Sequence, residues 1–231
     1  MEFEAPLVHG RLIRRYKRFL ADIEMDSGEQ VTAHCTNSGS MKSCIEEGAE
    51  VYLSPAKNTE RKTLFTWEMI KINGNWVGVN TLRPNQIAFE AVKQNEIDQL
   101  KGYSLIKREV TYKNSRFDLY CENKTESCYV EVKNVTLKEN EWALFPDAVS
   151  VRAQKHLQTL IEVKSNGIRA VMLYIVQRTD VSFFTPAKSI DPVYAKLLSE
   201  AVGKGVEVIV MQAGVSPKGI KLIKQMPVIL Q

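Results

Sequence analysis

The chain of 231 residues lacks several features that would define its class at once. It has four cysteines, and none of them lies in the C-x-x-C spacing typical of zinc sites. We therefore expect no zinc centre and, in a reducing compartment, free thiols. No apolar run reaches the roughly 20 residues that cross a bilayer, and the start Met1-Glu2-Phe3-Glu4 is unlike a basic signal peptide. The expectation is a soluble, cytoplasmic protein with no membrane partner.

The chain also lacks a strong charge of one sign. Its formal net charge is +4; Lys and Arg against Asp and Glu number 10 and 11 in residues 1–80, and 21 and 16 in residues 81–231. Neither part is basic enough to indicate nucleic-acid binding by composition alone. There is no internal repeat and no low-complexity linker, and no helix-turn-helix pattern supports sequence-specific operator reading.

The pattern of apolar residues changes near residue 80. Before it, short β-type segments separated by turns predict a small all-β barrel, with strands near 7–14, 18–25, 31–35, 48–53, 66–72 and 76–79. After it, helices near 85–94, 147–164 and 192–202 alternate with strands near 103–112, 170–176 and 206–211, and a strand pair near 216–224 closes the chain. This alternation predicts a mixed α/β sheet with right-handed crossovers. The predicted domains are residues 1–80 and 81–231, packed closely together.

Residues 116–135 predict a β-hairpin whose turn lies between residues 124 and 125. Folding there places Cys121 opposite Cys128 and Asp118 opposite Glu131. Like charges facing each other at about 4.5–5.5 Å are destabilising, so the two carboxylates favour a cation between them. Lys133 is two residues beyond Glu131 and shares its face of the strand. The two cysteines leave a second explanation open, a pair of thiols that could bridge under oxidation.

Two carboxylates and a lysine suit phosphodiester hydrolysis. Asp118 and Glu131 supply hard oxygen ligands for Mg²⁺ or Mn²⁺ and leave room for water and phosphate oxygens. Such an ion lowers the pKa of bound water, and Lys133 could orient or deprotonate that water or hold the phosphate. The D-x(n)-E-x-K spacing also arises often by chance, so a salt-bridged surface hairpin explains it as well.

Asp118 followed by Glu131-Val132-Lys133 resembles the PD-(D/E)XK nuclease core. Almost the whole chain resembles the sugar fermentation stimulation protein A family of bacteria and archaea, through the segments GRLIRRYKRFLADIE, HCTNSGSM, RKTLFTWEMIKI, WVGVNT, EVKNVTL, ALFPDAVSVRAQKHL and IDPVYAKLL. The resemblance implies an N-terminal OB-like barrel, a C-terminal nuclease-like domain, DNA binding and a link to sugar, notably maltose, metabolism. Two positions depart from the family pattern: Ser38 stands where a threonine is expected, and Phe117 stands in place of proline before Asp118.

The nuclease resemblance also implies supporting residues on two helices. A glutamate from the helix before the hairpin often joins the metal site of such enzymes, and Glu90 is the candidate here. Gln154 and Lys155 resemble a helix-borne pair that supports the metal or the phosphate. From the residues alone, Glu90 is an ordinary helix-surface residue and the pair is a polar helix face. Asp147 is placed at the start of that later helix, where its charge would favour the macrodipole.

Candidate DNA contacts come from four segments. Five cations lie within eight residues near the N-terminus, interleaved with Tyr16 and Phe19, which suits backbone tracking and base stacking. The small residues of the loop at 36–41 could form an anion-binding nest, and a basic loop near residue 61 and the end of the strand at 170–176 add further cations. The alternatives are a charged strand edge and a plain turn. The candidates are Arg11, Arg14, Arg15, Lys17, Arg18, Asn37, Arg61, Lys62 and Arg178.

Three functions fit these patterns. The first is a Mg²⁺- or Mn²⁺-dependent DNA nuclease that uses Asp118, Glu131 and Lys133. The second is a non-cleaving regulator of sugar metabolism genes on a nuclease-like scaffold, with non-specific or structure-specific DNA binding. The third is a protein-interaction module in which Lys133 bonds to both acids. None of the patterns specifies the oligomeric state or the form of DNA.

Overall fold

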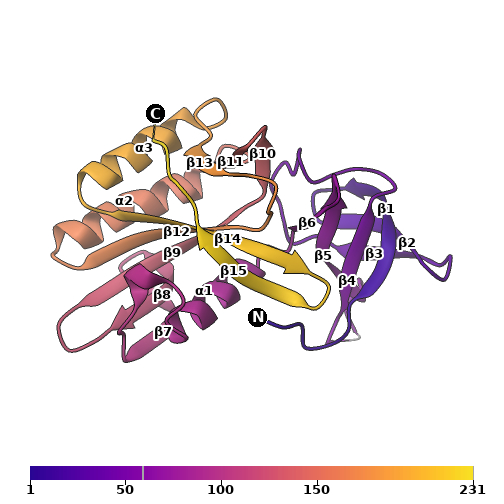
Figure 1. Cartoon of the computed structure of the whole chain (residues 1–231), viewed down its shortest axis with the longest axis horizontal. Coiled ribbons are helices and arrows are strands. Elements are labelled where there is room, and N and C mark those ends of the chain that lie inside the picture. The colour runs from indigo at the N-terminus through magenta and orange to yellow at the C-terminus, as the bar shows by residue number, and fades with distance from the viewer. Residues whose placement is uncertain (59, 231) are drawn as a thin grey trace.

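The computed structural model describes residues 1–58 and 60–230, which form two domains side by side (Figure 1). Six strands precede residue 80, and three helices and nine further strands follow it among the described residues. The predicted fold class, a small β-barrel followed by a mixed-sheet α/β domain, is confirmed. No helix in the described ranges is long and apolar enough to cross a membrane.

The N-terminal domain is a closed five-stranded barrel. Its strands follow the order β3-β2-β1-β4-β5, and a parallel pairing of β3 with β5 closes the sheet, while β6 extends it beyond β5. Closure removes the free sheet edges that would otherwise invite pairing with another chain. The barrel interior is filled by side chains such as Leu12, Ile23 and Trp67. The strands are β1 (Val8–Tyr16), β2 (Leu20–Met25), β3 (Gln30–His34), β4 (Glu50–Pro55), β5 (Phe65–Ile72) and β6 (Asn75–Gly78).

The second domain is built on a six-stranded sheet of order β15-β14-β12-β9-β8-β7. The central strands β9, β12 and β14 are parallel to their neighbours in this group, and the outer pairings are antiparallel. The sheet elements are β7 (Leu105–Tyr112), β8 (Ser115–Glu122), β9 (Ser127–Val135), β12 (Arg169–Val176), β14 (Glu207–Ser216) and β15 (Gly219–Gln225). The helices are α1 (Arg83–Lys93), α2 (Val151–Ser165) and α3 (Pro192–Gly203), with a short 3₁₀ turn at Asp98–Leu100.

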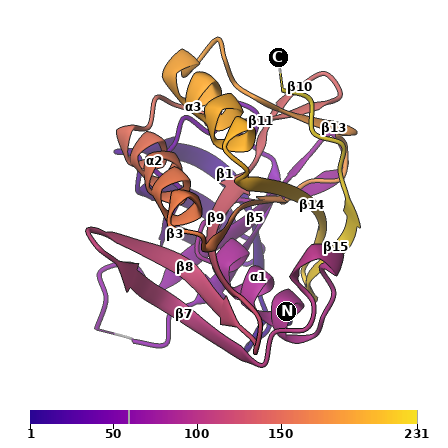
Figure 2. The same ribbon diagram turned by 90° about the vertical axis from the view of Figure 1, so that its left-hand side faces the viewer.

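Helices cover both faces of this sheet. Helix α1 packs on one face, and α2 and α3 pack on the other (Figure 2). The central strand β12 is buried along nearly all its length, with Met172 and Tyr174 on the side of α2 and Val171 and Leu173 on the side of α1. This confirms the prediction that the apolar run at 170–176 is a strand covered on both faces.

A small three-stranded sheet was absent from the sequence prediction. It joins β10 (Leu137–Glu139), β11 (Trp142–Phe145) and β13 (Phe183–Pro186). Strands of three or four residues carry too little alternation to be recognised from a pattern. Strand β11 occupies residues that were predicted to lead into the next helix, so helix α2 begins later than predicted. Its N-cap is Ser150, whose hydroxyl oxygen accepts a hydrogen bond from the Ala153 N–H at 3.2 Å.

The two domains share a hydrogen-bonded interface. The Gly78 N–H donates to the Gln177 backbone carbonyl at 2.9 Å, and Gln177 Nε2 donates to the Gly78 carbonyl at 3.1 Å. A Cβ atom at Gly78 would lie 2.5 Å from Gln177 Oε1, so a larger side chain would require the Gln177 side chain to shift from its place in the interface. From the other domain, the Asp147 carboxylate accepts from the Met41 N–H at 3.1 Å. Asp147 thus lies in the loop before α2 and forms a hydrogen bond to the barrel. It does not lie at the helix N-terminus, where it was predicted to interact with the helix dipole.

Arg178 lies inside this interface and is 1% exposed. Its guanidinium forms a two-bond ion pair with Asp180 at 2.7 and 2.9 Å and donates to the Thr136 carbonyl at 2.7 Å. Burial disfavours ionised Asp180, but the hydrogen bonds from Arg178 and Lys138 outweigh it and lower the pKa of Asp180 to about 2. The prediction that Arg178 contacts DNA is wrong, because its donors are used within the interface and solvent cannot reach them.

Replacing Arg178 by methionine should leave the buried Asp180 charge without its main partner. We expect the free energy of unfolding to fall by roughly 3–5 kcal/mol, measured by urea denaturation. The matched control is Arg14→Met, because Arg14 pairs with Asp22 while 65% exposed. There the loss should stay below about 1 kcal/mol. Equal losses for the two variants would contradict the structural role of the buried pair.

Candidate active site

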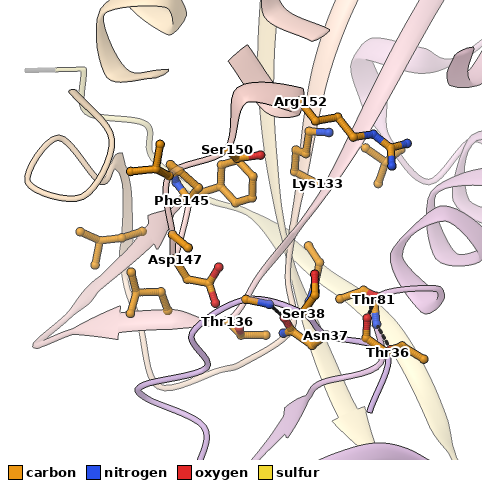
Figure 3. A pocket seen from close by; sticks show the side chains of 18 of the residues that line it. Thr36, Asn37, Ser38, Thr81, Lys133, Thr136, Phe145, Asp147, Ser150 and Arg152 are labelled. Atoms are coloured by element: carbon orange, nitrogen blue, oxygen red, sulfur yellow. Dashed lines mark hydrogen bonds between the residues drawn. The ribbon is translucent and has the colours of Figure 1, made fainter. Parts of the chain in front are cut away.

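A cavity of about 470 Å³ lies between the two domains. The barrel contributes Arg18 and the loop at residues 36–39, and the α/β domain contributes β8, β9 and the segment leading into α2. The three predicted catalytic residues, Asp118, Glu131 and Lys133, all line it. Figure 3 shows Lys133 and Arg152 among the side chains that line the cavity, and Asp147 on the side of the loop that carries Asn37 and Ser38.

Asp118 is positioned by a change in strand pairing. The β8–β9 ladder pairs Cys121 with Cys128, as predicted, but its last pair is Leu119 with Val130, so the predicted strand pairing of Asp118 with Glu131 does not form. One residue further, Asp118 Oδ2 accepts a hydrogen bond from the Val132 N–H at 2.7 Å. The carboxylate thus pairs with a backbone donor that the strand partner no longer reaches.

The same point marks a change of face along β8. Leu119 packs in the core beneath α1, whereas Phe117 packs in the core beneath α2. Regular alternation would put residues two apart on one face, so the strand must turn at Asp118. The turn brings the Asp118 carboxylate to the interdomain cavity, where it contacts Asn85 of α1.

Glu131 and Lys133 share one face of β9, as predicted. Lys133 Nζ lies 2.5 Å from Glu131 Oε1, and His156 Nδ1 on α2 contacts the same oxygen. Lys133 Nζ is also 3.5 Å from His156 Nδ1. Among the described residues, Lys133 therefore bonds to one acid and not to both, which is not the arrangement expected of the interaction module.

The two carboxylates differ in their ionisation. Burial, and next the charge of Glu131, raise the pKa of Asp118 to about 6, although the Val132 N–H, Lys133 and Asn85 partly offset the rise. Burial also opposes ionisation of Glu131, but the hydrogen bond to His156 and the charge of Lys133 outweigh it and lower the pKa of Glu131. The cavity therefore holds one ionised carboxylate and one that titrates near neutrality.

Glu131 leaves one oxygen available to a ligand. Its Oε2 atom is buried and has no hydrogen-bond partner within residues 1–58 and 60–230. A buried acceptor without a partner costs about 1–3 kcal/mol, more when charged. A divalent cation bound by this oxygen and by Asp118 would remove that cost and relieve the repulsion between the acids.

Side chains alone would not saturate such a cation. No cluster of three or more His, Cys, Asp or Glu side chains in the described ranges has the geometry of a metal site. Two carboxylates leave most of the coordination sphere to water or to phosphate oxygens, which is the usual state of protein-bound Mg²⁺. The donor set fits Mg²⁺ or Mn²⁺ and does not fit a closed structural site. The four cysteines are free and buried.

Glu90 does not join the cluster. Its carboxylate lies 3.2 Å from the N-terminal ammonium of Met1 and accepts from Gln86 Nε2, beside a separate pocket. The residue of α1 that reaches the site is Asn85 and not Glu90, because Asn85 Nδ2 donates to Asp118 Oδ1 at 2.6 Å. Five positions along a helix correspond to about 140° around its axis, so Asn85 and Glu90 cannot face the same cavity.

The Gln154–Lys155 pair is also directed away from the carboxylates. Gln154 Nε2 donates to the two carboxylate oxygens of Asp191, at 2.9 and 3.1 Å, and Asp191 is the N-cap of α3. Lys155 is exposed, and its Nζ lies 3.4 Å from the Asn114 carbonyl. The helix residue that reaches the site is the next one, His156. His156 lies on the buried, mostly apolar face of α2. A histidine at a core-facing position of the helix was the sequence signal that could have identified it as a site residue.

The predicted DNA contacts divide into two groups. Some organise the barrel: Arg15 donates to the carbonyls of Asn37 and Gly39 at 2.8 and 3.0 Å, and Asn37 Oδ1 accepts from the Gly39 N–H at 2.9 Å. Arg11 donates to the Gly48 carbonyl and Arg14 pairs with Asp22. The second group is exposed and consists of Lys17, Arg18, Arg61 and Lys62.

Within the second group, Arg18 lines the cavity that holds the carboxylates. Arg61 lines a different cavity at the barrel. Arg152, which the sequence reasoning missed, also lines the first cavity from the opening turn of α2. Cations therefore reach this cavity from both domains.

Two family models match the chain: "SfsA N-terminal OB domain" over residues 13–79 and "Sugar fermentation stimulation protein RE domain" over residues 82–219. The sugar fermentation stimulation protein homolog of Geotalea uraniireducens is 49% identical over 229 residues, 99% of each chain. The homolog of Paramagnetospirillum magneticum is 52% identical, over 96% of this chain and 95% of that one. The solved structure of Pyrococcus furiosus SfsA in complex with Ca²⁺ has a TM-score of 0.91 and 29% identity, over 99% of this chain and 98% of that one.

Replacing Asp118 by asparagine should stabilise the metal-free protein at pH 8. The folded pKa of Asp118, about 6, exceeds the ordinary 3.8, so folding disfavours the charged form and stability falls as pH rises from 4 to 6. Asparagine removes this penalty, and Asn85 can turn its amide to accept from the new side chain. We expect a gain on the order of 2 kcal/mol at pH 8 and none below pH 4, measured by urea unfolding with a chelator present.

The control for this experiment is Asp98→Asn, because the Asp98 side chain is 83% exposed. Its effect should stay within about 0.5 kcal/mol. A gain for Asp118→Asn that does not shrink between pH 8 and pH 4 would show that relief of the carboxylate charge is not its cause.

Proposed function

Because this chain belongs to the sugar fermentation stimulation protein family, we propose that it is a divalent-metal-dependent nuclease that hydrolyses phosphodiester bonds in DNA. The observation that carries the proposal is the unpartnered, buried Oε2 of Glu131 beside Asp118 and Lys133. Lys133 and His156 contact only Oε1 of Glu131, so among the described residues its second oxygen is a buried acceptor without a partner, which lowers stability. A group retained at such a cost suggests a ligand.

The solved relative supports a divalent ion. Pyrococcus furiosus SfsA was solved in complex with Ca²⁺, and its fold matches this chain almost throughout. Ca²⁺ and Mg²⁺ are both hard cations that prefer oxygen ligands, although Mg²⁺ keeps more of its water. In this chain Asp118 and Glu131 would hold the ion. When bound, the ion would lower the pKa of a water molecule and neutralise charge on the phosphate.

The chain's own residues would prepare the site in three ways. His156 and Lys133 contact Glu131 Oε1, and Oε2 would be the oxygen that holds the ion. Asn85 and the Val132 N–H hold both oxygens of Asp118. Lys133, 14% exposed, would hold a phosphate oxygen or the attacking water as a point charge.

A non-cleaving DNA-binding regulator of sugar metabolism is the second candidate. The observation that favours it is the Lys133–Glu131 ion pair, which already neutralises one of the two acids. Exposed Arg18 and Arg152 would hold phosphate in either case. The two candidates differ in whether bonds are cut, so a cleavage assay separates them.

Three substitutions, Asp118→Ala, Glu131→Gln and Lys133→Met, should each reduce DNA cleavage in Mg²⁺ or Mn²⁺ at least about 100-fold. The first two remove a ligand of the metal ion, and the third removes the positive charge beside the reacting phosphate. The measurement is the release of fragments from end-labelled DNA by purified protein. Glu90→Gln and Lys155→Met are matched controls of the same residue types and should leave the rate unchanged. Cleavage that persists in the first three variants would assign it to another site. Binding without any cleavage would favour the regulator.

Mn²⁺ or Ca²⁺ should raise the melting temperature of the wild type and not that of Asp118→Ala. At an ion concentration about 100 times the Kd, the stabilisation is about 2.7 kcal/mol. Calorimetry at pH 6 in buffers of different ionisation enthalpy should show release of about half a proton per ion, because Asp118 is half protonated there. An equal shift in Asp118→Ala would place the ion elsewhere.

A further inference from the structure

Large apolar side chains are exposed around the cavity that holds Asp118 and Glu131. Val149 lines the cavity and is 66% exposed. Val151 is 74% exposed between two residues that line it, and Phe19 is 51% exposed directly after Arg18. Leu82, 67% exposed, directly follows Thr81, which lines the cavity. A single exposed apolar residue needs no explanation, but four from three segments, each lining the cavity or next in sequence to a lining residue, suggest an apolar ligand surface.

A second cavity of about 680 Å³ adjoins the first along the barrel. Thr36 lines both, Thr81 lines the first, and Leu82 and Arg83 line the second. The ridge between them is fixed by hydrogen bonds, because the Thr81 N–H donates to Thr36 Oγ1 at 3.0 Å and Thr81 Oγ1 donates to the Thr36 carbonyl at 3.1 Å (Figure 3). The two cavities therefore meet on either side of Thr36, and the exposed Leu82 lines the second of them.

Cations line both cavities. Arg18 and Arg152 line the first cavity, and Lys57, Arg61 and Arg83 line the second. Arg83 is partly committed, because its guanidinium binds the buried carboxylate of Glu68 at 2.6 and 2.9 Å. The barrel as a whole carries no excess of positive charge, with 10 cations against 11 anions in residues 1–80. A few cations on a barrel without excess positive charge suit one strand of phosphates, because a duplex carries twice the phosphate charge per unit length.

We propose that the DNA acted on at this site is single-stranded, with its backbone crossing the Thr36–Thr81 ridge and its unpaired bases packed against Phe19, Leu82 and Val149. This inference rests on the proposed function and specifies its substrate class. A duplex presents mainly sugar and phosphate to a protein rim, so apolar side chains there would gain little from it. An unpaired base exposes an apolar face that packs on such side chains whatever its identity.

The test compares one labelled DNA strand, the same strand annealed to its complement, and an RNA of the same sequence. The full-length wild type is assayed for cleavage in Mn²⁺, and Asp118→Ala is assayed for binding by fluorescence anisotropy. The single DNA strand should be cut at least about tenfold faster than the blunt duplex and bound about tenfold more tightly.

The outcomes separate the two proposals. A duplex cut as fast as the single strand, or faster, overturns the inference and leaves the nuclease in place. A preference for RNA overturns the choice of DNA. If nothing is cut, the proposed function fails, and the binding arm still decides the inference: tighter binding of the single strand supports it, and equal or weaker binding overturns it.

Substitution of these rim residues tests the proposed path of the strand. Phe19→Ala and Leu82→Ala should each raise KM for the single strand about tenfold with little change in kcat, because each removes one base contact far from the reacting phosphate. Ile223→Ala is the matched control, since Ile223 is 55% exposed on β15 and lines neither cavity. Unchanged KM in both rim variants, or an equal rise in the control, overturns the assignment of the rim.

Discussion

The organisation of the site depends on two carboxylates held in a largely buried position where β8 stops pairing with β9. The Val132 N–H freed at that point is occupied by Asp118, and this fixes Asp118 next to Glu131. Burial, and next the charge of Glu131, then raises the pKa of Asp118, while His156 and Lys133 keep Glu131 ionised. The local interruption of the sheet thus produces both the geometry and the unbalanced charge. It is a cost to stability that the hydrophobic cores on both faces of the sheet offset.

The barrel completes the cavity as well as adjoining it. Its loop at residues 36–41 is held from within by Arg15 and from across the interface by Asp147. A side chain at Gly39 would overlap the Asp147 carboxylate, so the loop can approach this closely only with glycine there. Part of the cationic run near the N-terminus therefore builds the wall of the site. Arg18, at the end of that run, is the member that reaches the cavity.

Residues that are neighbours in the sequence were the easiest to place. The hairpin register, and the common face of Glu131 and Lys133, follow from strand periodicity and the position of one turn. The site residues on the helices were harder to predict. Amphipathic spacing identifies the buried face of a helix, but it does not show which residue beside that face contacts another element. Asn85 was therefore missed in favour of Glu90, and His156 in favour of Gln154 and Lys155. Arg178 follows an apolar strand in the sequence as a ligand contact would, and only the docking of the barrel buries it.

The contact between Gly78 and Gln177 has a consequence for how the two halves can vary. Each partner is shaped by the other: the strand end must stay without a side chain, and the amide must stay in place to bond to it. Asp147 and the 36–41 loop impose a similar mutual requirement. A chimera that takes its barrel from one relative and its α/β domain from another would therefore need matching residues on both sides of the domain interface. Substitutions at these interface positions in one domain should accordingly be accompanied by substitutions in the other.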